Sequence, residues 1–377
     1  MSQRPDRLGR LPEQYFTRLL ARVAEAAAAE GDELVDLGRG NPDVPPPAHV
    51  VDVLREAAGG SQAHGYPPFL GLPELKEALA ARYRAVYGVE LDSEREVAVV
   101  PGTKTAIVEL ALCLAGRGDA ILLPDPGYPD YASGVALAGA RELRVRLDPD
   151  EDFGPDLDAA PREGVAALYL NYPSNPSATT APPGTFERAV DYARETGAAV
   201  VHDFAYGDLV FDGRRPESFL AAQGARDVGV EMFSMSKSYG MAGWRLGFVV
   251  GSAEIVARVN LLQDHVLAGV FRPIQEAGIA ALTGPQDTVE ERRALYQARR
   301  DRVLAVLPDA RCDGTFFVWW PLRGGLTPES LLARHRVAVA PGEGFGPSGT
   351  GWARVSLATP DERLDLGLER LAAALRS

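Results

Sequence analysis

A lysine among serine and glycine residues is the feature of the sequence that most clearly indicates chemistry. Lys237 lies in the segment 234–240, directly after an apolar run typical of a β-strand. Ligands of open α/β sheets bind at the carboxyl ends of such strands. A lysine that burial or a nearby cation makes less basic is a good nucleophile toward aldehydes. Ser234 and Ser236 add hydroxyl donors, and Arg245, eight residues after the lysine, adds a planar group suited to phosphate.

Two other segments contain residues that could hold anions. Gly102, Thr103 and Lys104 follow a strand-like run and open a helical pattern. Backbone N–H groups at a helix N-terminus bind anions, although a plain strand-to-helix turn would have the same sequence. Arg354 lies inside the apolar run 352–357. An arginine buried in a strand needs an anionic partner, which is either a bound carboxylate or an internal Asp or Glu.

Several aromatic and polar residues stand where predicted strands end. Tyr128 could stack on a flat heterocycle, or be an ordinary core tyrosine. Asn175 lies in a proline-rich turn, and Asp203 ends a buried strand three residues before Tyr206. A carboxylate in that position is costly unless paired, either with a protonated ring nitrogen or with the N-terminus of the next helix. The neighbouring His202 is interpreted as structural, because the five histidines are scattered and none has metal-ligand spacing.

The elements that would position these residues alternate between strands and helices. Short apolar runs predict strands at 97–100, 120–123, 143–147, 165–170, 198–201, 230–233 and 246–250. Several runs are apolar at successive positions, which is typical of strands covered by helices on both faces. Helical patterns at 107–114 and 185–195 lie between them. The sequence therefore predicts a mainly parallel α/β sheet.

The order of elements changes after about residue 285. A long charged helix is expected over 287–307, and strand-like runs follow at 316–320, 337–340 and 352–357. The last helix has leucines on one face. These patterns predict a second, smaller α+β domain, and 377 residues are enough for two domains.

Composition excludes several classes of function. The net charge of −13 disfavours nucleic acid as a partner. No window of about 18 apolar residues could span a membrane, and residues 1–10 lack the apolar core of a signal peptide. Two cysteines, Cys113 and Cys312, make neither a disulfide framework nor a metal motif. We therefore expect a soluble, cytoplasmic protein without a metal.

The segments described above, in this order, resemble those of class I and II aminotransferases, which are pyridoxal-phosphate enzymes of fold type I. The resemblance covers the chain from about Asp36 to its end. It implies a large domain with a mainly parallel seven-stranded sheet between helices, and a smaller α+β domain. The implied division is an N-terminal arm and part of the small domain in 1–45, the cofactor-binding domain in 46–284 and the small C-terminal domain in 285–377.

The resemblance also implies a role for each candidate residue. Lys237 would form the internal Schiff base and act in catalysis with Asp203 and Tyr206. The implied cofactor-binding residues are Tyr66, Gly102, Thr103, Lys104, Tyr128, Asn175, Asp203, Tyr206, Ser234, Ser236, Lys237 and Arg245. The implied substrate-binding residues are Gly40, Asn175 and Arg354. Tyr66 would reach the cofactor phosphate of a neighbouring subunit, which implies a homodimer with shared active sites. Ser177 and Ala178 depart from the threonine and glycine usual after the family's asparagine.

The implied activity is transfer of an amino group between an L-amino acid and a 2-oxo acid by a ping-pong mechanism with pyridoxal 5′-phosphate. The sequence is most similar to the branch containing LL-diaminopimelate and methionine-forming aminotransferases. It leaves the substrate open, and Arg39 and Arg272 are candidate side-chain contacts or ordinary surface residues. Two alternatives use similar residues: a pyridoxal-phosphate C–S β-lyase, and a non-catalytic effector-binding protein with this fold.

Overall fold

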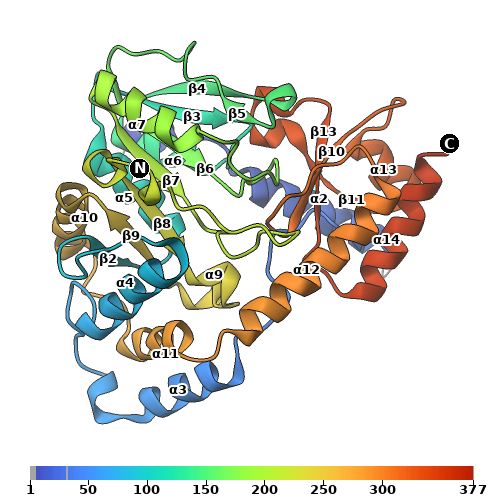
Figure 1. Cartoon of the computed structure of the whole chain (residues 1–377). Coiled ribbons are helices and arrows are strands. Elements are labelled where there is room, and N and C mark those ends of the chain that lie inside the picture. The colour runs from blue at the N-terminus through green and yellow to red at the C-terminus, as the bar shows by residue number, and fades with distance from the viewer. Residues whose placement is uncertain (1–5, 31–32, 377) are drawn as a thin grey trace, which may run out of the picture.

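The computed structural model describes residues 6–30 and 33–376 and shows two groups of elements, joined by the long helix α12 (Asp287–Val306) and by the extended segment 41–47 (Figure 1). Residues 1–5 of the expected N-terminal arm, residues 31–32 and residue 377 lie outside this description. One group is built around a large sheet. The other contains the last quarter of the chain together with residues 15–36.

Within the described residues, eight strands form the large sheet, in the order β2-β9-β8-β7-β6-β3-β4-β5. They are β2 (Val97–Val100), β3 (Ala120–Asp125), β4 (Arg141–Asp148), β5 (Gly154–Pro155), β6 (Val165–Asn171), β7 (Ala199–Asp203), β8 (Gly229–Ser234) and β9 (Gly247–Gly251). The pairs from β4 through β8 are parallel, whereas β9 is antiparallel to both of its neighbours. All seven strands expected from the apolar runs are present, and the two-residue β5 is added at the edge.

Helices cover both faces of this sheet. Successive side chains of a strand point to opposite faces, so neighbouring residues of one strand belong to different apolar clusters. Ile121 and Leu123 of β3 belong to an apolar cluster completed by α5, α6 and α10. Leu122, between them, belongs to the cluster on the other face, completed by α4, α7 and α11. The helices of this group are α3 (Ala48–Gly59), α4 (Pro73–Tyr87), α5 (Thr103–Leu114), α6 (Tyr131–Ala138), α7 (Thr185–Thr196), α8 (Ala225–Val228), α9 (Met235–Ser238), α10 (Ala253–Val266) and α11 (Arg272–Thr283).

The second group has its own apolar core. An antiparallel sheet has the order β10-β13-β12, and β1 pairs in parallel with β11. The strands are β1 (Val35–Asp36), β10 (Phe317–Pro321), β11 (Val337–Ala338), β12 (Ala340–Pro341) and β13 (Trp352–Ser356), and the helices are α2 (Tyr15–Glu30), α12 (Asp287–Val306), α13 (Pro328–His335) and α14 (Asp361–Ala374). Helix α1 (Asp6–Gly9) packs instead against α6 of the first group. One cluster joins Val35 and Leu37 to residues of α12, β13 and α14. We accordingly propose domain boundaries near residues 45 and 284.

One face of α12 holds the proline-rich segment 41–47 that crosses between the two groups. Arg292, Tyr296 and Arg299 follow one another at spacings of four and three residues, so they share a face of the helix. The Tyr296 hydroxyl donates to Asp43 at 2.9 Å, and Arg299 donates to the same carboxylate at 2.7 Å. Arg292 donates to the carbonyl of Pro45 at 2.8 Å and to that of Ser238, the residue after Lys237. The helix therefore links the crossing segment to the end of α9.

Candidate active site

A cavity of about 610 Å³ lies where three neighbouring strands of the large sheet end. The last residues of these strands, Asn171 of β6, Asp203 of β7 and Ser234 of β8, all line it. The second group of elements closes it with residues such as Gly40 and Arg354. The candidate residues that line it are Gly40, Thr103, Lys104, Tyr128, Asn175, Asp203, Tyr206, Ser234, Ser236, Lys237, Arg245 and Arg354. The structure thus brings together residues that are more than 300 positions apart.

Lys237 lies in α9, directly after β8. The Ser234 hydroxyl caps this short helix by accepting from the Ser236 N–H at 3.1 Å. The lysine Nζ lies 5.8 Å from the centre of the Tyr206 ring and 5.2 Å from that of Phe316. Burial lowers the pKa of Lys237 to about 8, and the positive charges of two arginines act in the same direction. The side chain therefore has the properties of an amine nucleophile at neutral pH.

Asp203 ends β7 as a buried carboxylate. It accepts from the Tyr131 hydroxyl at 2.8 Å and from the Ala205 N–H at 3.3 Å. Burial raises its pKa, and these hydrogen bonds counteract the effect. No lysine or arginine in the described part of the chain lies within 4 Å of this carboxylate, so it lacks an ionic partner of its own. Such a group suits a protonated nitrogen of a ligand.

Gly102 and Arg245 form a narrow corner at the start of α5. Gly102 has φ +86°, and a Cβ added there would lie 2.3 Å from an Arg245 nitrogen, so only glycine fits. The helix begins at Thr103 with its N-terminus directed at this corner. Lys104 pairs with Asp130 at 2.7 Å, so its backbone N–H is the part that could face a ligand. The corner combines an arginine with helix N–H groups, which fits a phosphate.

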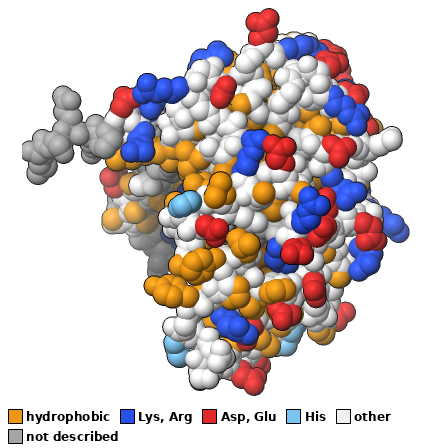
Figure 2. Space-filling model, turned by 90° about the vertical axis from the view of Figure 1, so that its left-hand side faces the viewer, with side chains coloured by type: hydrophobic (Ala, Val, Ile, Leu, Met, Phe, Trp, Pro, Cys, Tyr) orange, Lys and Arg blue, Asp and Glu red, His pale blue; other side chains and the backbone are white. Residues whose placement is uncertain are grey.

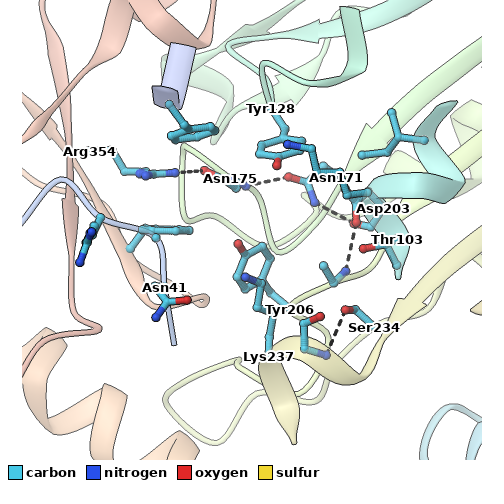
Figure 3. A pocket seen from close by; sticks show the side chains of 18 of the residues that line it. Asn41, Thr103, Tyr128, Asn171, Asn175, Asp203, Tyr206, Ser234, Lys237 and Arg354 are labelled. Carbon is cyan, nitrogen blue, oxygen red and sulfur yellow. Dashed lines mark hydrogen bonds between the residues drawn. The ribbon is translucent and has the colours of Figure 1, made fainter. Parts of the chain in front are cut away.

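A chain of hydrogen bonds joins Arg354 to the strand that carries Asp203 (Figure 3). Arg354 donates to the Asn175 side-chain oxygen at 2.8 Å. The Asn175 N–H donates to the side-chain oxygen of Asn171 at 2.7 Å. The Asn171 amide donates to the Asp203 carbonyl at 2.7 Å. These hydrogen bonds fix the position of Arg354 relative to Asp203.

Arg354 is buried and incompletely paired. Its Nη2 donates to the Gly38 carbonyl at 3.2 Å, while its Nε has no hydrogen-bond partner among the described residues. The guanidinium carbon lies 3.8 Å from the centre of the Phe317 ring. Burial lowers the pKa of this arginine to about 10. A Cβ added at Gly40 would lie 3.1 Å from Phe317, so glycine keeps space open beside the guanidinium. These observations fit a carboxylate ligand.

Some site residues carry no role in the sequence analysis. Asn171 and Tyr131 both contact Asp203, and a signal for the first exists: a polar residue at the end of a buried strand, as for Asp203 itself. Phe16, Leu19 and Leu20 also line the cavity. Their apolar periodicity predicts a helix but gives no indication of which cavity the helix would cover.

The remaining candidates, Tyr66, Arg39 and Arg272, differ in their position relative to the cavity. Tyr66 is 86% exposed and does not line the cavity. Arg39 does line the cavity and has Asp36 at 3.8 Å. Arg272 pairs instead with Glu276 at 2.6 Å and is not part of the cavity wall.

Other kinds of site were sought in the described residues. In residues 6–30 and 33–376, no group of three or more His, Cys, Asp or Glu side chains is arranged to hold a metal ion. None of the helices in that same part of the chain is both long and apolar enough to cross a bilayer. His202 is fully buried and bonds Glu231 at 2.8 Å and the Tyr172 carbonyl at 3.0 Å.

Comparison with known proteins adds independent information. Residues 32–371 match the family model described as aminotransferase class I and II. L-glutamine–4-(methylsulfanyl)-2-oxobutanoate aminotransferase of Bacillus subtilis is 45% identical, over 95% of this chain and 92% of that protein. LL-diaminopimelate aminotransferase of Desulforudis audaxviator is 40% identical, over 98% and 97% respectively. The substrate-bound structure of BacF from Bacillus subtilis superposes with a TM-score of 0.94 at 36% identity, covering 99% of this chain and 98% of that one.

Proposed function

The chain belongs to the class I and II aminotransferase family, and from this premise we propose that its cavity holds pyridoxal 5′-phosphate with Lys237 as the attachment point. The protein is an enzyme that transfers amino groups between an amino acid and a 2-oxo acid. The similar proteins named above are aminotransferases. A C–S β-lyase and a non-catalytic effector-binding protein are therefore not favoured.

One arrangement carries the proposal. Lys237, a buried lysine with a lowered pKa, lies between Asp203 and Arg354. Among the residues that the structure describes, Asp203 has no ionic partner and the Arg354 Nε has no hydrogen-bond partner. In Figure 3, Arg354 and Asp203 lie at opposite ends of the site, with Lys237 and Tyr206 between them. The chain thus offers separate positions for a carboxylate, an aldehyde carbon and a ring nitrogen.

The residues present suit each part of the cofactor. Arg245, the N-terminus of α5 and the serine hydroxyls would hold the phosphate. Asp203 would hold the protonated ring nitrogen, which supplies the cation that this buried carboxylate lacks. Tyr206 and Asn175 would donate to the ring oxygen, and Tyr128 would cover a ring face.

The protein's contribution to the reaction follows from these positions. When bound, pyridoxal phosphate supplies an aldehyde that links to amines and a ring that accepts electrons. Arg354 and Asn175 would hold the substrate carboxylate and so fix the orientation of the Cα–H bond. Nζ of Lys237 would take the proton from Cα and deliver it to the cofactor carbon C4′. Asp203 would keep the ring nitrogen protonated throughout. A 2-oxo acid then enters the same cavity for the reverse half-reaction, which gives ping-pong kinetics.

We also propose a homodimer, in which Tyr66 reaches the cofactor phosphate of the second subunit. The exposure of Tyr66 and its absence from the cavity wall of its own chain support this proposal. We further propose a cytoplasmic location. Cys113 and Cys312 are unpaired, as is usual in a reducing compartment.

The attachment point can be tested with little ambiguity, because the chain has only three lysines: Lys76, Lys104 and Lys237. The purified protein should be yellow, and borohydride reduction should leave a phosphopyridoxyl group, equal in mass to the cofactor less one oxygen atom, on the peptide that contains Lys237. Lys237→Ala should lower kcat by at least about 1000-fold. Peptide mass spectrometry is the measurement, and the peptides of Lys76 and Lys104 serve as internal controls. A phosphopyridoxyl group on either of these two lysines, or a colourless active enzyme, would contradict the proposal.

A further inference from the structure

A buried imidazole and a buried carboxylate lie behind the strand end that carries Asp203. His202 precedes Asp203 in β7 and therefore points to the opposite face of the sheet. Its register partner in β8 is Glu231, and the His202 Nδ1 lies 2.8 Å from the Glu231 Oε2. Both side chains are 0% exposed, and neither lines the cavity. The pair is thus enclosed within one subunit, where a second subunit cannot contact it.

Glu231 is surrounded by hydrogen-bond donors. Its Oε1 accepts from the Tyr83 hydroxyl at 2.7 Å, and its Oε2 accepts from the Phe219 N–H at 2.9 Å. The Ser218 hydroxyl lies 3.0 and 3.1 Å from the two oxygens. With the imidazole, four donors face a group that offers about four lone-pair sites when ionised. No site remains for a proton, so Glu231 is a carboxylate.

A fully buried carboxylate needs a positive partner. No lysine or arginine of residues 6–30 and 33–376 forms an ion pair with Glu231, which leaves His202 to supply the charge. The second ring nitrogen of His202, Nε2, lies 3.0 Å from the Tyr172 carbonyl oxygen and 3.3 Å from the Tyr172 nitrogen. The shorter contact is to an acceptor, which favours a proton on Nε2 as well as on Nδ1. The rings of Phe186 and Phe204 enclose the imidazole, with centres 4.9 and 5.2 Å from its own.

Two effects of this imidazolium reach the site. The Tyr172 carbonyl that it holds belongs to the turn between Asn171 and Asn175. The Asn171 amide in turn donates to the Asp203 carbonyl at 2.7 Å. Burial raises the pKa of the Asp203 carboxyl, and the positive charge of the imidazole is one of the influences that counteract it. The imidazolium therefore acts on both the position and the charge of residues that line the cavity.

We infer that His202 is a positioning residue of this site: protonated on both ring nitrogens and paired with Glu231, it fixes the backbone before Asn175 and keeps Asp203 ionised for the ring nitrogen of the cofactor. The action on the cofactor rests on the proposed function, whereas the protonation of the imidazole is a property of the chain alone. A histidine with a merely structural role would leave Asp203 unaffected.

Nitrogen NMR of the full chain, labelled in its five histidines, tests the protonation of the imidazole. The signals of His202 are identified by their loss in His202→Gln, or by replacing the other four histidines one at a time. Both ring nitrogens should carry a proton, with and without cofactor, and both protons should exchange slowly because the ring is buried. A single protonated nitrogen would overturn the inference.

Cofactor binding tests the action on Asp203. The probes are pyridoxal phosphate and its carbocyclic analogue, in which a CH group replaces the ring nitrogen, so that only the first can use the carboxylate. Wild-type cofactor-free protein should bind pyridoxal phosphate at least about 30-fold more tightly than the analogue. The double variant with His202→Gln and Glu231→Gln loses both buried charges together, which avoids leaving one of them unpaired. It should lose at least about fivefold of this preference.

Glu109→Gln is the matched control for a buried carboxylate changed to an amide. Glu109 is 4% exposed, accepts from the Gln263 amide at 3.0 Å and does not line the cavity. This variant should keep the wild-type preference. An unchanged preference in the double variant, or an equal loss in Glu109→Gln, would overturn the action on Asp203. A protein that binds neither probe, while its His202 shows both protons, would overturn the proposed function instead.

Discussion

The pKa of Lys237 depends on nearby charges of both signs as well as on burial. Arg354 and Arg245 lower its pKa, and Asp203 raises it. The resulting value of about 8 lies below the ordinary lysine value of about 10.4. Lowering a pKa means that the uncharged amine is favoured in the folded protein, so the reactive form is abundant from about pH 8 upward rather than only above pH 10.

This balance predicts opposite effects for two substitutions. The rate at which cofactor-free protein combines with pyridoxal phosphate should rise with pH through a midpoint near 8. Arg354→Met should raise this midpoint, because it removes a positive charge that lowers the lysine pKa. Asp203→Asn should lower the midpoint, because it removes a negative charge that raises the same pKa. Stopped-flow absorbance between pH 6 and about 11 measures this midpoint for the wild-type protein and for both variants. Shifts in one common direction would contradict this account.

Helix α12 acts on the site through the face that carries Arg292 and contacts the segment 41–47. Arg292 is buried, no carboxylate in the described part of the chain pairs with it, and burial lowers its pKa. Its donors are used by backbone carbonyls of the crossing segment and of Ser238. A Cβ added at Gly240, which has φ +69°, would lie 2.9 Å from Arg292, so the arginine fits closely against the turn after α9. The position of Lys237 therefore depends on a side chain outside the cavity.

Arg292→Met should both destabilise the protein and disturb the lysine. Loss of the donors leaves buried carbonyls without partners, which costs about 2–4 kcal/mol in the free energy of unfolding. The pH midpoint of the cofactor absorbance should shift as well, and Arg292→Lys should restore part of that shift. Arg293→Met is the control, because Arg293 pairs with Glu290 at the surface. Denaturant unfolding and spectral titration are the measurements. Equal results for the Arg292→Met and Arg293→Met variants would refute the positioning role.

The sequence predicts local features of this fold well and distant contacts poorly. The seven expected strands follow from apolar runs. Most of these runs are apolar at successive positions, as strands covered on both faces must be, whereas β4 alternates apolar residues with arginines. Asp203 and Lys237 are recognisable because charged residues directly after buried strands need a reason to be there. The contacts of Arg292 and of Phe16 join positions far apart in the chain. No pattern within either helix specifies such a partner.

At the scale of the whole molecule, an exposed apolar surface accompanies Tyr66. The Tyr66 and Phe69 rings lie 6.3 Å apart, and the loop that carries them packs on Gly269. Val266 and Phe271, on either side of that glycine, are also exposed. Figure 2, which views the side of the molecule that carries α10, shows hydrophobic side chains gathered on part of this face. Apolar patches of this kind are typical of surfaces that other protein surfaces cover.

The proposed dimer predicts a molecular mass in solution twice that of the chain. Phe271→Asp should shift the protein toward the monomer and weaken cofactor binding at the same time, because Tyr66 would lose its position in the second subunit. Tyr66→Phe should weaken cofactor binding while leaving the mass unchanged. Light scattering after gel filtration and cofactor titration are the measurements, with Leu375→Asp as the surface control. A monomeric wild-type protein that binds cofactor tightly would contradict the dimer.

The pairing of β1 with β11 has a consequence for the order in which the protein acquires its structure during synthesis. Val35 pairs with Val337, so the ribosome must make about three hundred further residues before the first strand meets its partner. The large sheet is complete in the chain by Gly251 and can assemble earlier. Strand β1 must therefore remain unpaired beside a nearly complete sheet, and the active site becomes complete only once Arg354 of β13 has been synthesised.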